Sequence, residues 1–182
     1  LSLISAREFL NGKFRWCLWL EDISPKELRT MPTVMERVEK VRIFRESSPA
    51  VSTQKHALTP TLFRDRNRPN TFIVIPRVSS ERRLYIPMGF FDRNYIVSDT
   101  CLSIPNGDLF LFGQLTSVMH MAWVKYTCGR LKSDYRYSKD LVYNNYPFPK
   151  NVSEKQKKAV EEKAQNVLNI RSQFSDCSLA DL

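Results

Sequence analysis

The residues best suited to chemistry lie in one stretch, Lys125 to Lys139, where cations alternate with tyrosines. The five cations are Lys125, Arg130, Lys132, Arg136 and Lys139, and the tyrosines between them are Tyr126, Tyr135 and Tyr137. Lysine and arginine neutralise phosphates, and aromatic rings can stack on bases. Any one of these residues is compatible with an ordinary protein surface. Together they predict a nucleic-acid face.

A second cationic stretch, Arg64 to Arg83, contains six arginines and no lysine. The planar guanidinium suits two-pronged contacts to phosphate and to guanine edges, so this bias toward arginine is informative. Over the whole chain, 28 basic residues face 19 acidic ones, which gives a formal charge of +9. That balance favours a polyanionic partner.

Other kinds of chemistry find little support. The four cysteines lie far apart without a C-x-x-C pair, and there are two histidines, so the sequence predicts neither a metal site nor a disulfide framework. Among only five glycines there is no glycine-rich phosphate loop, and no G-x-S-x-G occurs. We therefore expect this chain by itself not to be an enzyme.

The cellular setting follows from similar observations. No apolar run reaches the roughly 18 residues that a membrane span requires. Thiols that are not arranged in pairs fit a reducing compartment, so the sequence predicts a cytoplasmic protein that does not enter a membrane. The chain begins without Met, and we expect it to be a fragment of a larger protein.

The central part of the chain, which must position the cationic residues, is predicted to form a small sheet. Thr71 to Pro76 (TFIVIP) predicts a strand, and three shorter strands are expected at Tyr85 to Pro87, Tyr95 to Ser98 and Thr100 to Ile104. Pro105-Asn106-Gly107-Asp108 is a strong turn signal.

An apolar helix should follow this turn and end where Gly129 provides a C-cap. Its buried face is expected to hold Met119, Ala122, Trp123 and Tyr126. The chain beyond it, through Tyr143, is expected to be extended.

Further helices are predicted at both ends of the chain. Capping boxes at Ser24 and Ser153 each start a helix, the second running to about Ser172, and another helix should follow Pro32. Phe14 to Leu20 (FRWCLWL) predicts a buried strand or a docking segment. The fold class expected is α+β: a small, mostly antiparallel sheet with packed helices, a helical N-terminal segment and a C-terminal helix. The expected division is 1–62, 63–149 and 150–182.

Three strings resemble the target recognition domain of MmeI-type restriction–modification enzymes: PRVSSERRLYIPMGF from Pro76, HMAWVKYTCGRLKSDYRYS from His120 and VYNNYPFP from Val142. Such type IIG or IIL enzymes combine a nuclease, an adenine-N6 methyltransferase and a specificity domain in one polypeptide. The resemblance implies recognition of double-stranded DNA beside a methyltransferase domain of the same polypeptide. It also implies that S-adenosylmethionine, and Mg²⁺ if a nuclease is present, serve parts that precede Leu1, with no cofactor in this fragment.

The resemblance further implies two sets of site residues. Base-reading candidates fall at variable positions next to the shared strings: Leu84, Asn106, Gly107, Lys139, Leu141 and Tyr143. Candidates for contacting phosphate or for holding the reading loops are Arg77, Arg82, Arg83, Arg130, Lys132, Tyr135 and Arg136. Leu84 and Gly107 lack hydrogen-bonding side chains, which leaves open which bases are read.

Alternatives remain open at this stage. The basic and aromatic stretch would also suit an RNA-binding module, and the outer helices would suit a protein-interaction module of a larger assembly. For single residues, the competing interpretation is structural: the tyrosines pack in the sheet, and Arg82 or Arg136 pairs with Glu81 or Asp134.

Overall fold

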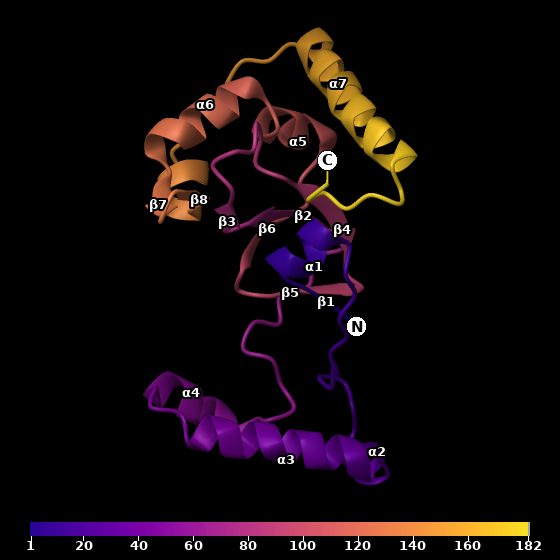
Figure 1. The fold of residues 1–182 in the computed structure, drawn as a ribbon. Helices are drawn as coiled ribbons and strands as arrows, with labels where there is room; N and C mark the ends of the chain where they lie inside the picture. The colour runs from indigo at the N-terminus through magenta and orange to yellow at the C-terminus, as the bar shows by residue number, and fades with distance from the viewer. Residues whose placement is uncertain (182) are drawn as a thin grey trace. The chain divides into compact units, whose positions relative to one another are not determined.

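The computed structural model describes residues 1–181, and it divides into two compact units (Figure 1). The helical unit comprises Leu1 and Cys17–Arg68, and the sheet unit comprises Ser2–Trp16 together with the chain from Pro69 onward.

The helical unit is built from three helices and a short turn. They are α2 (Pro25–Arg29), α3 (Pro32–Glu46), α4 (Val51–Lys55) and the 3₁₀ turn η1 (His56–Leu58). The capping box predicted at Ser24 is confirmed: its hydroxyl accepts from the Glu27 backbone amide, and its own amide donates to the Glu27 carboxylate. The helix predicted after Pro32 is also present, as α3. From Cys17 to Arg68 the one buried residue is Ala57, so this unit encloses almost no core of its own.

The sheet unit is organised around β2 (Thr71–Pro76), which pairs antiparallel with β4 (Gly89–Asp92) and with β6 (Cys101–Pro105). Side chains of a strand alternate between its two faces. Ile73 and Ile75 enter one core, and Phe72 and Val74 enter the other. The strand predicted from TFIVIP is confirmed and is buried on both faces.

Three helices contribute to the first core. Ile73 and Ile75 share it with residues of α5 (Leu109–Leu115), α6 (Val118–Thr127) and α7 (Glu154–Gln173). A Cβ atom at Gly113 would lie 2.6 Å from the Val160 Cγ1 atom, so glycine lets α5 approach α7 closely. The capping box predicted at Ser153 is confirmed at the start of α7.

Two smaller sheets complete the sheet unit. β1 (Ser2–Ile4) runs parallel to β5 (Tyr95–Val97), and α1 (Ala6–Asn11) follows β1. The third sheet has the order β3–β8–β7, from Val78–Ser79, Asp134–Arg136 and Gly129–Leu131, with antiparallel pairing throughout. A π-helical turn, η2, spans Lys139–Tyr143. The predicted α+β class with small, mostly antiparallel sheets is confirmed.

Some local predictions were wrong. Helix α6 buries His120, Met121 and Val124, whereas Met119 and Tyr126, expected in the core, are 69% and 92% exposed. Gly129 is not a C-cap, because α6 ends at Thr127 and Gly129 is already paired in β7.

Three further stretches also differ from expectation. Tyr85–Pro87 forms no strand, and the predicted extended chain through Tyr143 is interrupted by η2. The prediction of burial for Phe14–Leu20 is wrong as well. Trp16 forms an isolated bridge to Ser2, and the side chains of Phe14 and Trp16 are 77% and 73% exposed.

Candidate nucleic-acid interface

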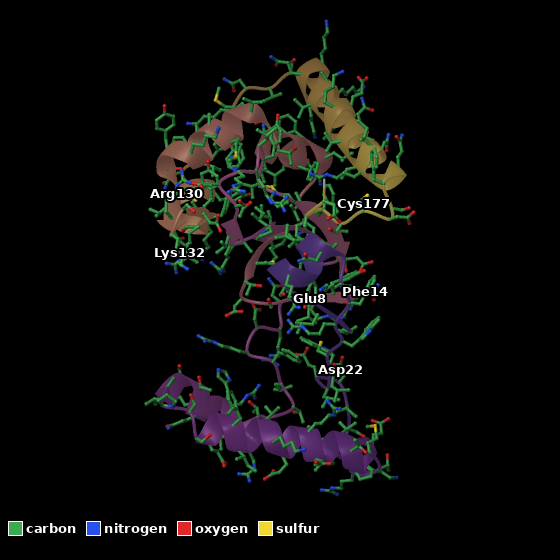
Figure 2. The ribbon with its side chains drawn as sticks, in the orientation of Figure 1. Glu8, Phe14, Asp22, Arg130, Lys132 and Cys177 are labelled. Carbon is green, nitrogen blue, oxygen red and sulfur yellow. The ribbon has the colours of Figure 1, made fainter. Side chains whose placement is uncertain are left out.

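The β7–β8 hairpin displays the central cations of the basic segment, and Figure 2 labels Arg130 and Lys132 on it. Lys132 occupies the turn with a φ of +55°, in the left-handed region. The Arg130 guanidinium lies over the Tyr135 ring, 4.0 Å from its centroid, and its Nη1 donates to the Ser133 carbonyl at 2.9 Å. These contacts hold Arg130 against the hairpin. All three residues, Arg130, Lys132 and Arg136, are exposed.

The tyrosines of this segment serve mainly as core. Tyr135 and Tyr137 are only 4% and 1% exposed, and Tyr143 is half-buried. Their rings are therefore not free platforms for stacking bases, and the structural interpretation holds for them. Tyr126 on α6 is the freely exposed ring of the segment.

A buried polar contact supports the hairpin from below. The His120 Nε2 atom lies 2.9 Å from the Tyr137 hydroxyl, with both residues enclosed by the first core. Burial lowers the pKa of His120 to about 4 and raises the pKa of Tyr137. Both side chains are therefore neutral at pH 7. Because His120 is fully buried, it is a packing residue of the site.

The turn η2 presents the next pair of candidates. Ser138 caps it through its hydroxyl, and Val142 anchors it: that side chain is fully buried and its carbonyl accepts from the Trp123 indole at 2.9 Å. Lys139 is exposed and Leu141 is 57% exposed. Single π-helical turns occur often at functional sites, because they displace side chains from the ordinary helical positions.

The loop between β3 and β4 carries Arg82, Arg83 and Leu84. The amide of Glu81 donates to the Asp134 carboxylate at 3.3 Å, which ties the loop to the β7–β8 hairpin. Arg82 is exposed and Leu84 is 78% exposed. This loop, hairpin β7–β8 and η2 are thus consecutive parts of one hydrogen-bonded framework, because β3 also pairs with β8.

Asn106 and Gly107 lie elsewhere, at the other end of β2. The Asn106 amide donates to the carbonyl of Thr71, the first residue of β2, whereas the framework joins β2 through Arg77 after its last residue. A Cβ atom on Gly107 would approach Ile73 Cδ1 to 2.5 Å, so packing alone requires glycine there. Asn106 has a φ of +54° and an exposed side chain. Six strand residues separate the two places by roughly 17–20 Å.

The cations among the candidate residues, which include Lys139 from the predicted base-reading set, divide into two groups by their partners. Arg77 donates to the Asp99 carbonyl at 2.6 Å, Arg83 donates to the Leu179 carbonyl at 3.0 Å, and Arg130 is held as described. The second group consists of Arg82, Lys132, Arg136 and Lys139. Their side chains form no hydrogen bond or ion pair with any residue in 1–181, so the expected pairing of Arg82 or Arg136 with Glu81 or Asp134 does not occur.

The geometry therefore offers four unpartnered cations on one connected framework, beside exposed Leu84 and Leu141. Comparison with protein families gives this arrangement its context, since residues 1–150 match the family described as the MmeI target recognition domain. The chain belongs to the MmeI target recognition domain family. Residues 152–182 match the description of the MmeI C-terminal domain.

Two relatives extend this assignment. This MmeI-type domain is 42% identical over 171 residues to DNA methyltransferase A of Bacillus subtilis (strain 168), covering 93% of the chain and 19% of that protein. It is also similar to a solved structure of the type IIL restriction–modification enzyme MmeI in complex with DNA, with 43% identity and a TM-score of 0.94, covering 98% of this chain and 24% of that one. The chain thus spans about a fifth to a quarter of these relatives.

This MmeI-type domain shows no sign of a metal centre within residues 1–181, where no group of three or more histidine, cysteine or acidic side chains could hold an ion. Burial raises the pKa of the Cys101 thiol to about 12 and also raises the pKa of Cys128, so neither is an activated nucleophile. No helix in this part of the chain combines the length and apolarity needed to cross a membrane.

Sequence reasoning missed the residues that hold the framework together. Asp134 was considered only as a partner for arginine, yet its carboxylate accepts from a backbone amide of the β3–β4 loop. Arg171 was not singled out, although its Nη1 donates to the Met88 carbonyl at 2.7 Å beneath that loop's far end. Their spacing from the loop, 53 and 83 residues, leaves no local signal for either contact.

Proposed function

We propose that this chain is the specificity domain of a restriction–modification DNA methyltransferase and that it recognises a particular sequence in double-stranded DNA. The single observation that carries the proposal is the set of unpartnered cations Arg82, Lys132, Arg136 and Lys139 on the framework of loop, hairpin and π-turn. Cations without a protein partner are available to bind phosphate. Membership of the MmeI family, and the relative solved with DNA, support duplex DNA as the polyanion.

In this proposal the two groups of cations have different roles. Arg82, Lys132 and Arg136 contact phosphates and orient the domain, which gives affinity without sequence preference. Arg77, Arg83 and Arg130 hold loops in place through backbone carbonyls. Tyr135 supports Arg130 from the core.

Base reading is assigned to the exposed tips. Lys139 and Leu141 on η2, Leu84 on the loop and Asn106 at the far end of β2 present side chains that can meet base edges in the major groove. The leucines would contact thymine methyl groups or exclude other bases. Gly107 and Tyr143 would act by shaping the backbone and the core beside these tips, since Gly107 has no room for a side chain and Tyr143 is half-buried.

The remaining functions belong to parts of the parent protein that this chain does not contain. We propose that the parent methylates adenine at N6 with S-adenosylmethionine in the cytoplasm and that any cleavage requires a Mg²⁺-dependent nuclease domain. The front segment, residues 1–62, would join the methyltransferase domain, residues 63–149 would read DNA, and residues 150–182 would form the C-terminal helix. This division follows the two matched ranges only approximately.

A titration against two labelled probes, a duplex DNA and an RNA of the same sequence, tests the proposal. The duplex is also titrated over a series of salt concentrations. We expect the 182-residue chain to prefer duplex DNA. The slope of log K against log salt should approach roughly −0.9 for each phosphate neutralised, hence about −3 for the three cations assigned to phosphate.

The other outcomes identify the rival functions. Preference for the RNA probe would point to an RNA-binding module. Absence of binding to either probe at low salt would leave a protein-interaction module and would overturn the proposal.

A further inference from the structure

We propose that the C-terminal tail, residues 174–181, positions the reading loop, and that Arg83 acts as a positioning residue by holding this tail and not as a phosphate ligand. The inference rests on the proposed function, because it concerns how the loop that carries Leu84 is kept in place for sequence discrimination.

The tail leaves α7 and returns to the sheet, as Figure 1 shows, and Figure 2 labels Cys177 along it. A tight turn shapes its end: the amide and the hydroxyl of Ser178 both donate to the Asp181 carboxylate, at 2.9 and 2.6 Å. These bonds lower the pKa of Asp181, so the turn is formed at neutral pH. The tail therefore has a defined conformation of its own.

Two contacts fasten this turn to the sheet unit. The Ala180 amide donates to the Leu10 carbonyl at the end of α1, at 2.8 Å. The side chain of Leu179 packs against the second core, which contains Phe9 and Phe72. The tail thus rests on the second core through contacts that do not involve the β3–β4 loop.

Arg83 connects the reading loop to this fixed point. Its Nη1 donates to the Leu179 carbonyl at 3.0 Å, across 96 residues of sequence, and its side chain is half-buried. The neighbouring Arg82 is exposed, and its side chain has no partner in residues 1–181. The two adjacent arginines therefore differ: Arg83 binds the tail, and Arg82 is exposed to solvent.

The segment from Arg82 to Tyr85 needs this support, because the hydrogen bond from α7 to the loop, between Arg171 and the Met88 carbonyl, lies at the far end of the loop. A groove of about 790 Å³ separates this segment from α7, lined on the loop side by Leu84 and Tyr85 and on the helix side by Val167, Ile170 and Phe174. Leu84 itself is 78% exposed. Without the bond from Arg83, the segment between the Glu81–Asp134 contact and the buried Ile86 would lose its one side-chain attachment to the tail.

The test is a double-mutant cycle on DNA discrimination. Duplexes enriched from a randomised pool by the wild-type chain provide a preferred site, and single base changes in it provide competitors. Arg83→Ala and removal of residues 174–182 are made separately and together, with Arg82→Ala as the matched control. Ser178→Ala, which weakens the turn but keeps Leu179 in the core, replaces the truncation if the truncated chain does not fold by circular dichroism.

If Arg83 positions the loop, Arg83→Ala and the tail variant should each reduce the preference for the selected site over its competitors by about tenfold, the effect of one charged hydrogen bond. The double variant should be no worse than either single one, because both changes remove the same contact. The salt slope should stay unchanged in all three, whereas Arg82→Ala should make it shallower by roughly 0.9 and leave the preference intact.

Opposite results are equally clear. If Arg83→Ala makes the salt slope shallower and its effect adds to that of the truncation, Arg83 is a phosphate ligand and the inference is wrong. If the wild-type chain enriches no sequence at all, the proposed function itself fails, which is a separate outcome.

Discussion

Helix α3 and the framework formed by the β3–β4 loop, the β7–β8 hairpin and η2 are both rich in cations, but these cations differ in how many have partners within the protein. In α3, three of the four cations are held: Lys40 pairs with Glu36 at 2.6 Å, Arg42 pairs with Glu39 and Glu46, and Arg45 donates to three backbone carbonyls. The fourth, Arg37, is exposed and has no side-chain partner within residues 1–181. In the framework, Arg82, Lys132, Arg136 and Lys139 have no such partners within residues 1–181. Charge density along the sequence is therefore a poor guide to a binding face, and the state of pairing is a better one.

The two regions differ equally in what lies beneath them. The framework rests on a core in which Tyr137, Val142 and His120 are at most 1% exposed, whereas α3 buries no residue at all. A binding face needs cations that are free and a support that is rigid. Only the framework combines the two.

The largest difference should appear in backbone hydrogen exchange. Amides of α3 should exchange at least a thousandfold faster than those of Ile73 and Ile75 in β2, because α3 buries no side chain and a helix of this length is marginally stable without a core, while core strands open only with global unfolding. Exchange followed by mass spectrometry on the 182-residue chain measures both. Equal protection of the amides of α3 and β2 from exchange would mean that α3 is stabilised by further packing interactions.

The next largest effect concerns DNA affinity. Replacing Arg82, Lys132 and Arg136 together by glutamine should weaken binding to any duplex by on the order of a thousandfold at moderate salt, at about tenfold per contact. The matched control replaces Lys40, Arg42 and Arg37 of α3, which removes the same charge. If the control weakens binding as much, net charge matters and the distinction between the two regions has no functional content.

A smaller effect is expected from pH, and it concerns the support under the hairpin. The pKa of His120 is about 4 in the folded protein, below its ordinary value of 6.5, so protonation favours the unfolded chain. This contribution to stability is complete above pH 6.5 and is lost as the pH falls toward 4, at a total of about 3 kcal/mol.

Urea unfolding at several pH values, compared with His120→Gln, measures it. Glutamine keeps a polar group facing the Tyr137 hydroxyl but does not titrate, so the stability of the variant should fall less steeply between pH 6.5 and 4. The same slope in both proteins would show that His120 is not what makes the fold sensitive to acid.

How much of this was visible in the sequence depends on the range of the interactions. The capping boxes at Ser24 and Ser153 and the strand Thr71–Pro76 were predicted correctly because their signals are complete within a few residues. The face of α6 was predicted wrongly because this short helix is apolar on most sides. Its orientation is set by a contact 17 residues away, between His120 and Tyr137.

The site shows the same limit. The cations of the hairpin were identified from spacing alone, but nothing local distinguishes Arg82, which is free, from Arg83, which binds the carbonyl of Leu179. Likewise, Gly129 resembled a helix cap until pairing with Arg136 made it a strand residue. Long-range hydrogen bonds determine the partner of Arg83 and the strand conformation of Gly129, and a single sequence carries no local signal for such bonds.

The smallest effect expected separates pairing from placement. In Glu36→Gln/Glu39→Gln/Glu46→Gln, Lys40 and Arg42 lose their carboxylate partners and join the free cations. Exposed pairs of this kind contribute little to stability, so the variant should unfold at nearly the same urea concentration.

Duplex DNA affinity of this variant should rise by no more than about twofold. Because the pairs are so weak, a nearby phosphate would already compete with the glutamates for Lys40 and Arg42 in the wild-type chain. Unchanged affinity would therefore place α3 outside the DNA interface. The ion pairs of Lys40 and Arg42 would then form because no phosphate competes for these cations. A gain of about tenfold for each released cation, with a steeper salt slope, would instead show that α3 meets DNA and that its glutamates had masked the contact.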